Sequence, residues 1–230
     1  MACEAGLEIG PDIALADDGD LPLTEDTAAD DAAIARHVAL VQSGGEVPFA
    51  LGGDHAVSFP LVAAAAARHG PVNILHIDAH SDLYDTLGGN RRSHASPFAR
   101  IMEGGHAARL VQVGIRTLNR HCREQAERFG VEIIPLADFT PATVPVLPGP
   151  LYISIDLDGI DPSEAPGVAH PEPGGLTVRE LLAVLRAQHV PIVGADIVEL
   201  NPQRDRGDVT AILAAKLVRE LAFLIHRNNS

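Results

Sequence analysis

Short apolar segments alternate with helical segments along most of the chain, and this alternation limits the possible folds more than any other feature. The apolar segments are rich in β-branched residues and span 47–53, 72–80, 109–115, 131–135, 151–159 and 191–200. The helical segments span 28–42, 58–69, 119–129, 177–189 and 208–227. Strands that alternate with helices favour a mostly parallel sheet with helices on both faces. The sequence therefore predicts an α/β fold.

Composition narrows the kind of protein further. A chain of 230 residues is long enough for one domain with a substantial core. Its formal net charge of −14 argues against nucleic acid or an anionic membrane as partner, and suits a small cationic substrate. No apolar run approaches the roughly 20 residues needed to cross a bilayer. The first residues lack the basic and then apolar pattern of a signal peptide, so we expect a cytoplasmic protein.

Charged residues and histidines directly follow several of the predicted strands. An unpaired buried charge is unfavourable, so a buried strand rarely continues in this way. In a parallel sheet the carboxyl ends of the strands lie at one edge, where functional groups collect. The residues at these ends are His55, Asp78, His80, Asp82, Asp156, Asp158 and Glu199. Residues two apart share a face of an extended segment, so each Asp-x-(Asp/His) pair should point one way.

This set of side chains indicates a metal centre. Carboxylates and imidazoles without a thiolate suit Mn²⁺, with Zn²⁺, Fe²⁺ and Ni²⁺ as less favoured alternatives. The six Asp and His ligands exceed what one ion needs if a position stays open for water. Two ions that share a bridging water account for the number better. The cations would also balance the buried carboxylates.

Three neighbouring residues have simpler explanations. Asp54 is equally well explained as the cap of a helix that starts near Ser58. His76 lies deeper in its strand, so we expect a buried, hydrogen-bonded histidine rather than a ligand. Asp161 precedes Pro162 and is expected to set a turn.

Three stretches resemble signature motifs of the ureohydrolase family, which includes arginases, agmatinases, guanidino-acid hydrolases and formimidoylglutamases. They are GGDHAVSFP (52–60), DAHSD (78–82) and SIDLDGIDPSEAPGVAHPEPGGLT (154–177). The resemblance runs from about residue 17 to residue 227 and is also specific in GADIVELNPQRD (194–205). The stretches at 93–105 and 112–132 are most similar to plant-type arginases.

The resemblance implies a single ureohydrolase domain over residues 1–230, with the three-layer α/β arginase fold around a mostly parallel central sheet. It also implies two Mn²⁺ ions per chain and a homotrimer or homohexamer. By match to the family motifs, the first ion would bind His55, Asp78, Asp82 and Asp156. The second ion would bind Asp78, His80, Asp156 and Asp158, so that Asp78 and Asp156 bridge the two.

Other matches concern the substrate. Asp82 would orient the attacking water, His94 matches the histidine that serves as proton shuttle, and Glu199 matches the glutamate that pairs with the guanidinium. His170 has a counterpart in plant-type sequences and either reaches the far end of the substrate or has no role. Glu199, His94 and His170 are therefore the candidate substrate-binding residues. Tyr84 replaces an asparagine of animal-type arginases, which weakens any transfer of their amino-acid clamp.

The predicted activity is hydrolysis of a guanidino group to urea and an amine. L-arginine, giving L-ornithine, is the favoured substrate. Agmatine, giving putrescine, and other guanidino acids such as guanidinobutyrate are the alternatives. A member of the family that binds metal without catalysis remains a further alternative.

The N-terminal part departs from the family pattern. Members usually carry a longer segment before the GGDH strand, whereas 51 residues precede Gly52 here. The resemblance therefore implies an N-terminally shortened domain whose first strand is missing. We expect residues 13–17 to move across and pair with 47–53, because an unpaired buried strand edge is unfavourable.

Overall fold

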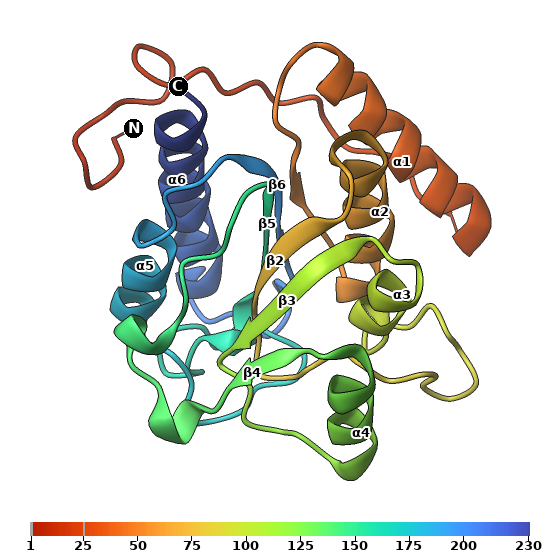
Figure 1. Cartoon of the computed structure of the whole chain (residues 1–230). Helices are drawn as coiled ribbons and strands as arrows, with labels where there is room; N and C mark the ends of the chain where they lie inside the picture. Colours follow the sequence, from red (N-terminus) through yellow and green to blue (C-terminus); the bar gives the residue numbers. More distant parts are fainter. Residues whose placement is uncertain (1, 25) are drawn as a thin grey trace.

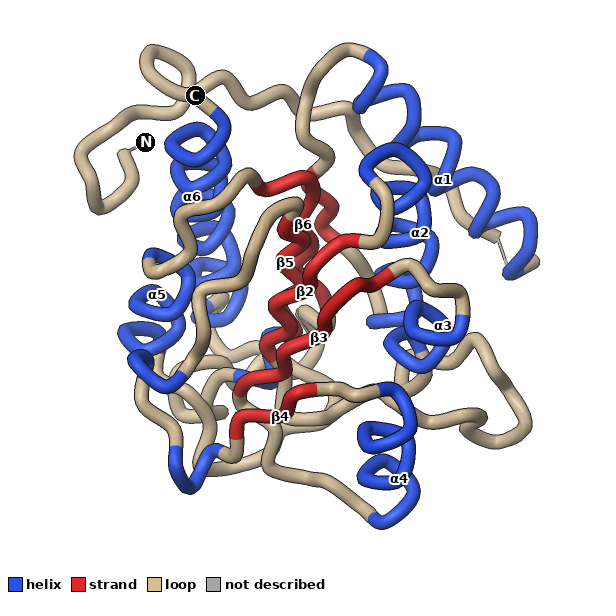
Figure 2. The backbone as a smooth tube through the Cα atoms, in the orientation of Figure 1, coloured by secondary structure: helices blue, strands red, loops and turns tan. Residues whose placement is uncertain are grey.

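The computed structural model describes residues 2–24 and 26–230, and one six-stranded sheet forms its centre (Figures 1 and 2). The strands are β1 Phe49–Leu51, β2 Val72–Ile77, β3 Ala107–Val113, β4 Glu132–Ile134, β5 Leu151–Asp156 and β6 Ile192–Val198. They lie in the order β1-β6-β5-β2-β3-β4, and every neighbouring pair is parallel. The prediction of an α/β fold with a mostly parallel sheet is confirmed.

Helices cover both faces of the sheet and complete three layers. They are α1 Thr27–Ser43, α2 Ser58–His69, α3 Pro97–Glu103, α4 Arg120–Phe129, α5 Val178–Arg186 and α6 Val209–Asn229. In Figure 1, α5 and α6 lie on one side of the sheet and α1 to α4 on the other. The structure also contains short 3₁₀ helices, which are η1 His55–Val57, η2 Leu136–Asp138, η3 Pro141–Thr143 and η4 Leu157–Gly159.

The central strands supply side chains to two apolar cores. Every residue of β2 and β5 is buried, so their side chains alternate between the two helix layers. On one face Ile77 belongs to the same cluster as Leu217 of α6. On the other face Ile74 belongs to the same cluster as Val62 of α2 and Phe98 of α3. The continuous apolar character of these strands therefore follows from burial on both faces.

Each predicted strand and helix has a counterpart, but the predicted strands extend too far at their carboxyl ends. β2 ends at Ile77 and β5 at Asp156, so their expected continuation to residues 80 and 159 is wrong. The carboxylate of Asp156 accepts a hydrogen bond from the N–H of Asp158, and this turn starts η4. The sequence did not predict α3, whose 7 residues are too few to show a helical period.

The N-terminal segment does not complete the sheet. Ile13 forms an isolated bridge with Ile9 and residues 14–24 contain no strand. Among the described residues, β1 pairs with β6 alone. The expected pairing of residues 13–17 with 47–53 is therefore wrong. The segment instead lies against α5 and α6, where Glu4 pairs with Arg186 at 2.7 Å and Lys216 at 2.9 Å. These ion pairs, with Asp17, Asp18 and Asp20 left exposed, explain why it does not cover an apolar sheet edge.

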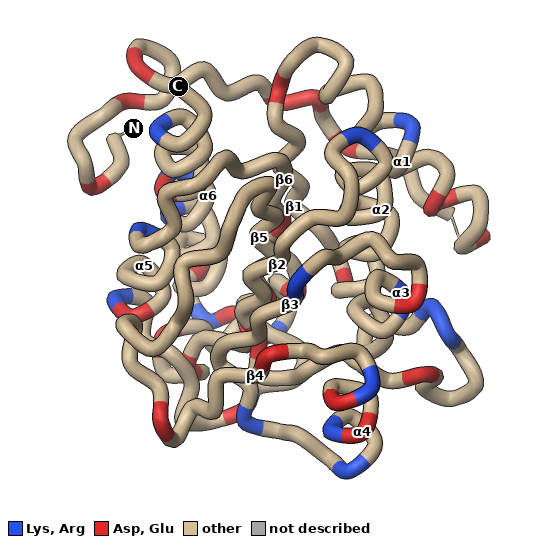
Figure 3. The backbone as a smooth tube through the Cα atoms, viewed as in Figure 1, with Lys and Arg blue, Asp and Glu red and all other residues tan. Residues whose placement is uncertain are grey.

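The N-terminal segment carries several acidic residues and no Lys or Arg, which accounts for part of the net negative charge (Figure 3). No helix in the described part of the chain is both long and apolar enough to cross a membrane.

Candidate metal centre

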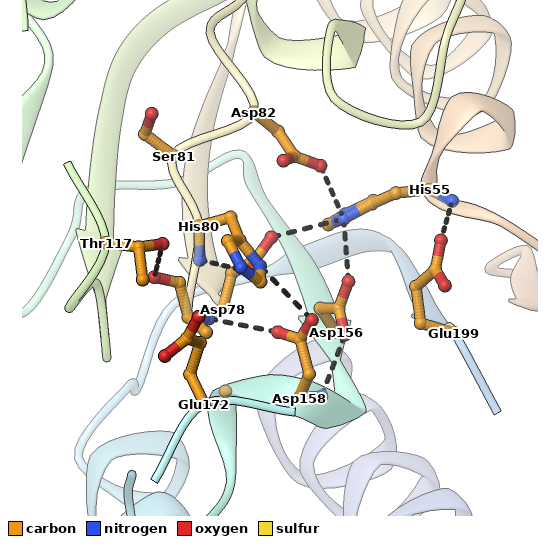
Figure 4. A network of polar contacts seen from close by, with 12 residues as sticks. His55, Asp78, His80, Ser81, Asp82, Thr117, Asp156, Asp158, Glu172 and Glu199 are labelled. Atoms are coloured by element: carbon orange, nitrogen blue, oxygen red, sulfur yellow. Dashed lines mark hydrogen bonds and ion pairs between the residues drawn. The ribbon is translucent and has the colours of Figure 1, made fainter. Parts of the chain in front are cut away.

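The carboxyl ends of β2 and β5 bring the predicted ligands together, although neither segment stays extended (Figure 4). After β2 the N–H of Asp78 still donates to the carbonyl of Val113 at 3.0 Å. Asp82 then adopts a positive φ of 49°, a conformation that few residues other than glycine adopt. After β5 the chain turns through η4, and Oδ1 of Asp158 accepts from the N–H of Ala79 at 3.1 Å. Tight turns, rather than strand alternation, therefore aim these side chains.

His55 reaches the same place from η1, the turn that follows β1. Its imidazole is buried, and Nδ1 lies 3.1 Å from Asp82, 3.2 Å from Asp156 and 3.3 Å from Asp78. Despite these neighbours, Nδ1 makes no hydrogen bond of suitable geometry to the described residues. Asp54 caps η1 by accepting from the N–H of Ala56, whereas the N-cap of α2 is Val57, so Asp54 has a capping role but not at the helix that starts at Ser58, as was expected. His55 thus presents a buried nitrogen to three carboxylates.

His80 lies on the other side of Asp78. Its Nδ1 is 3.2 Å from Oδ2 of Asp158 and 3.4 Å from Oδ1 of Asp78. The described residues accordingly contain two clusters with metal-binding geometry, and both include Asp78. Shared use of one carboxylate is what a pair of neighbouring ions requires.

His76 belongs geometrically to the first of these clusters, together with His55 and Asp78, yet both of its ring nitrogens are engaged. Nε2 lies 2.9 Å from Asp78, and Nδ1 lies 3.0 Å from the side-chain amide of Gln112. Burial lowers the pKa of His76 to about 4, against the opposing effect of Asp78, so the ring is neutral near neutral pH. The expectation of a buried, hydrogen-bonded histidine is confirmed. Through the contact at Nε2, His76 fixes the orientation of the Asp78 carboxylate.

The electrostatics of the cluster show a concentration of negative charge. Burial, and then the charge of Asp78, raise the pKa of Asp82 to about 7 and that of Asp158 to about 6. Burial would raise the pKa of Asp78, but the close approach of His55, His76 and His80 outweighs this effect and holds the pKa well below its ordinary value. Burial would lower the pKa of His80, but hydrogen bonds with Asp158 and Asp78 raise it to about 11. The site therefore needs bound cations or protons to be stable.

Divalent cations fit this donor set better than protons alone. The ligand atoms are carboxylate oxygens and imidazole nitrogens, the hard and borderline donors that suit Mn²⁺ and related ions. The buried Nδ1 of His55 has no hydrogen bond to any residue that the structure describes and faces the carboxylates, as a metal ligand would. A buried polar atom without a partner in a protein usually has a specific reason.

The candidate substrate residues lie around this cluster. Glu199 has a positive φ of 67°, and its Oε1 accepts from the N–H of His55 at 2.9 Å (Figure 4). His94 and His170 stack with ring centroids 5.3 Å apart and an interplanar angle of 18°. The ring of His170 also meets His80 edge-on at 6.2 Å. The structure therefore places His94 and His170 on the His80 side of the cluster and Glu199 on the His55 side.

A buried chain of polar groups behind His55 was not predicted. Nε2 of His55 lies 3.1 Å from the hydroxyl of Ser154, which donates to Asp196 at 2.7 Å. Tyr152 donates to the other oxygen of Asp196 at 2.8 Å. These contacts leave Nδ1 as the nitrogen that faces the carboxylates. The signal was present in the sequence, since Asp196 interrupts the apolar segment 191–200.

Comparisons with known proteins agree with this architecture. The model of the Arginase family matches residues 3–224. The chain is 49% identical to "Arginase 1, mitochondrial" of Arabidopsis thaliana, with 98% of this chain and 71% of that protein covered. The solved arginase of Medicago truncatula is 48% identical with a TM-score of 0.84, and 87% of this chain and 66% of that one are covered. Proclavaminate amidino hydrolase of Streptomyces clavuligerus is 31% identical with a TM-score of 0.88, covering 99% and 82%.

The chain thus spans only part of these relatives, from 66% of the Medicago structure to 82% of the Streptomyces one. The Arabidopsis relative is named as mitochondrial, so the expected cytoplasmic location has no support from it. The matched region includes the two metal-binding clusters and almost the whole chain. On this evidence the chain is a member of the arginase family, the metal-dependent ureohydrolases.

Proposed function

We propose that residues 1–230 act as one ureohydrolase domain that hydrolyses L-arginine to L-ornithine and urea with two Mn²⁺ ions. The observation that carries the proposal is the buried carboxylate and imidazole cluster with Glu199 beside it. A cationic, planar guanidinium is the substrate group that such an acidic site favours. Identity to plant arginases supports arginine, while amidino hydrolase and agmatinase relatives keep agmatine as the second candidate.

The ligands divide between the two ions. His55, Asp78, Asp82 and Asp156 would hold the first ion, and Asp78, His80, Asp156 and Asp158 the second. The ions would supply charge balance and an acidified water as nucleophile near neutral pH. The chain fixes the direction of these ligands beforehand, through η4 and through the contact between His76 and Asp78.

The remaining residues bind and orient the substrate and move protons. Asp82, on the His55 side of the cluster, would accept a hydrogen bond from the attacking water and aim it. The carboxylate of Glu199 would pair with the guanidinium and place its carbon above that water. His94 would donate a proton to the leaving amine, a role in which imidazole side chains commonly act. His170, stacked on His94, would contact the substrate further out.

A screen for urea release tests the proposal. Mn²⁺-loaded protein is incubated with arginine, agmatine, guanidinobutyrate and formiminoglutamate, and urea is measured for the first three and formamide for the fourth. We expect the highest kcat/KM with arginine. Preference for agmatine would move the protein to the second candidate. Binding of two ions with no turnover of any substrate would favour the non-catalytic alternative.

Four further features stay predictions of the proposal. A homotrimer or homohexamer is expected from the family resemblance, and the mass of the particle in solution measures it. The identity of the native metal, a cytoplasmic location and the absence of nucleic acid and membrane partners also remain predictions.

A further inference from the structure

Arg116 lies directly behind the second metal cluster, in the segment that follows β3. All of its hydrogen bonds go to main-chain carbonyl groups rather than to carboxylates. Nη2 donates to Asp158 and to Glu172, both at 2.6 Å. Nε donates to Glu172 at 3.0 Å, and Nη1 donates to Gly114 at 3.0 Å and Gly159 at 3.2 Å. The planar guanidinium thus uses its donors to join three separate segments.

The backbone of the same residue joins a fourth segment. The N–H groups of Arg116 and Thr117 donate to the carbonyl of Ala79 at 3.0 and 3.3 Å, between the candidate ligands Asp78 and His80. The N–H of Ala79 in turn donates to the carboxylate of Asp158. Thr117 and Glu172 accordingly appear beside Asp78 and Asp158 in Figure 4. Arg116 therefore connects the chain on both sides of the second cluster.

The packing around these contacts leaves little freedom. A Cβ atom on Gly175 would lie 2.8 Å from Nη2 of Arg116. A Cβ atom on Gly159 would lie 2.8 Å from the nitrogen of Asp78, and one on Gly114 would lie 2.7 Å from the carbonyl oxygen of Asp78. Gly114 also has a positive φ of 97°. Glycines let these segments approach closely enough for one guanidinium to bind them all.

Asp158 and His80 need such support because they lie outside the sheet. β5 ends at Asp156 and β2 ends at Ile77, and beyond β2 the pairing with the segment after β3 continues only as an isolated bridge between His80 and Thr117. Arg116 is half-buried, and its charge lies close enough to Asp158 and Asp78 for these carboxylates to oppose the lowering of its pKa by burial. A guanidinium keeps its positive charge at all ordinary pH values.

We propose that Arg116 is a positioning residue for the second ion. It holds Asp158 and His80, the proposed ligands of the second ion alone, in ligating geometry and supplies a fixed positive charge behind them, before any ion binds. The inference rests on the proposed two-ion site. It predicts that the second ion depends on Arg116, whereas the first ion, on the His55 side, does not.

The test compares Arg116→Lys and Arg116→Gln with the wild-type protein in Mn²⁺ titrations followed by electron paramagnetic resonance. Asp158→Ala identifies the binding step that belongs to the second ion. Arg109→Lys is the matched control, because Arg109 lies on β3 but pairs with Glu132 at an exposed position. We expect Arg116→Lys to weaken the second step by roughly 10–100-fold, the usual effect of losing a group that orients metal ligands. The first step and the control should keep the wild-type affinity.

Thermal unfolding in EDTA separates positioning from a general structural role. Arg116→Lys should unfold close to the wild-type temperature while still losing affinity for the second ion. Unchanged affinity in both variants would overturn the inference. Equal weakening of both steps, or failure of Arg116→Lys to fold, would assign Arg116 to the fold itself and also overturn it. If the wild-type protein binds fewer than two ions, the proposed function fails first, and this result is distinct from the others.

Discussion

At the scale of single residues, the candidate centre depends on carboxylates that two ions would share. Asp156 is buried, lies 3.2 Å from His55, and accepts the N–H of Asp158 with its other oxygen. It therefore contacts ligands on both sides of the cluster. We predict that Asp156→Ala removes both ions, which elemental analysis of the dialysed protein would measure. Asp138→Ala, at an exposed position in η2, is the control. Retention of one ion would show that Asp156 serves a single ion.

His94 is predicted to act on protons and not on metal. It stacks on His170 and belongs to neither of the metal-binding clusters of the described residues. His94→Ala should keep both ions and lower kcat by roughly 10²–10⁴-fold, the usual loss for a missing general acid. Metal content and urea release are measured on the same preparation, with the exposed His189→Ala as control. Loss of metal in His94→Ala would place this histidine among the ligands.

The candidate ligands could be identified from the sequence because charged residues rarely follow a buried strand directly, so their presence there indicates a functional site. The polar groups that support the ligands were harder to find. Gln112 and Ser154 lie in apolar strands, and polar residues of that kind are common in any sheet. Their partners, His76 and His55, come from other strands or turns. Such contacts depend on strand order and register, which one sequence does not specify.

At the scale of elements, the loop between β2 and α3 carries His94. The side chain of Arg92, in the same loop, connects it to neighbouring elements. Nε of Arg92 donates to Asp31 of α1 at 3.0 Å, and Nη2 donates to the other carboxylate oxygen. The guanidinium also reaches the carbonyl of Ala56 in η1 and lies over the ring of Phe59 at 4.4 Å. A side chain in this loop thus links α1 and η1 to the position of His94.

We predict that Arg92→Lys loosens this loop, since an ammonium cannot reproduce the two parallel hydrogen bonds of a guanidinium. The expected loss of stability is about 1.5–3 kcal/mol, typical of hydrogen bonds to a charged group. Hydrogen exchange of residues 85–96 should increase and kcat should fall, while both ions stay bound. Arg128→Lys removes a similar contact with Phe129 at the far helix α4 and should change neither. Unchanged exchange in the loop would contradict the prediction.

The elements themselves were predicted unevenly. Buried strands and long amphipathic helices follow from apolar periodicity, and the capping box of Thr177 and Glu180 is present at the start of α5. The strands were predicted to extend too far at their carboxyl ends. The Asp-rich turns that follow them continue the alternating pattern of a strand in the sequence. The pairing of residues 13–17 was wrong for a different reason. It assumed that the open edge of β1 would attract any nearby segment, whereas ion pairs of Glu4 with α5 and α6 decide where this segment lies.

At the scale of the whole molecule, these ion pairs join the N-terminal segment to the helix layer of α5 and α6. Glu220 of α6 is buried, and its carboxylate accepts the N–H of Glu4 at 2.8 Å, Lys216 at 3.0 Å and Arg186 at 3.0 Å. Cys3, which precedes Glu4 in the sequence, is also buried. The segment therefore contributes to stability through charge, which makes the contribution sensitive to pH.

The sign of this pH dependence follows from Glu4. Hydrogen bonds with Arg186 and then Lys216 lower its pKa from the ordinary 4.5 to about 2. A carboxylate whose pKa falls on folding stabilises the folded state above its unfolded pKa, and this stabilisation is lost as the pH falls towards the folded value. We therefore predict that Glu4→Gln is less stable than wild type at pH 7, and that the difference shrinks below pH 4.5 and disappears near pH 2.

Urea unfolding measured at several pH values in EDTA would test this, since EDTA removes any contribution from bound ions. Hydrogen exchange of residues 2–13 should rise in Glu4→Gln at pH 7, because the segment loses its partners on α5 and α6. Glu8→Gln removes a carboxylate from the same segment without removing these ion pairs, so it should follow the wild type at every pH. A stability difference between Glu4→Gln and wild type that stays constant from pH 7 to pH 2 would mean that packing around Cys3 and Ile13, and not the charge of Glu4, holds the segment on the helices.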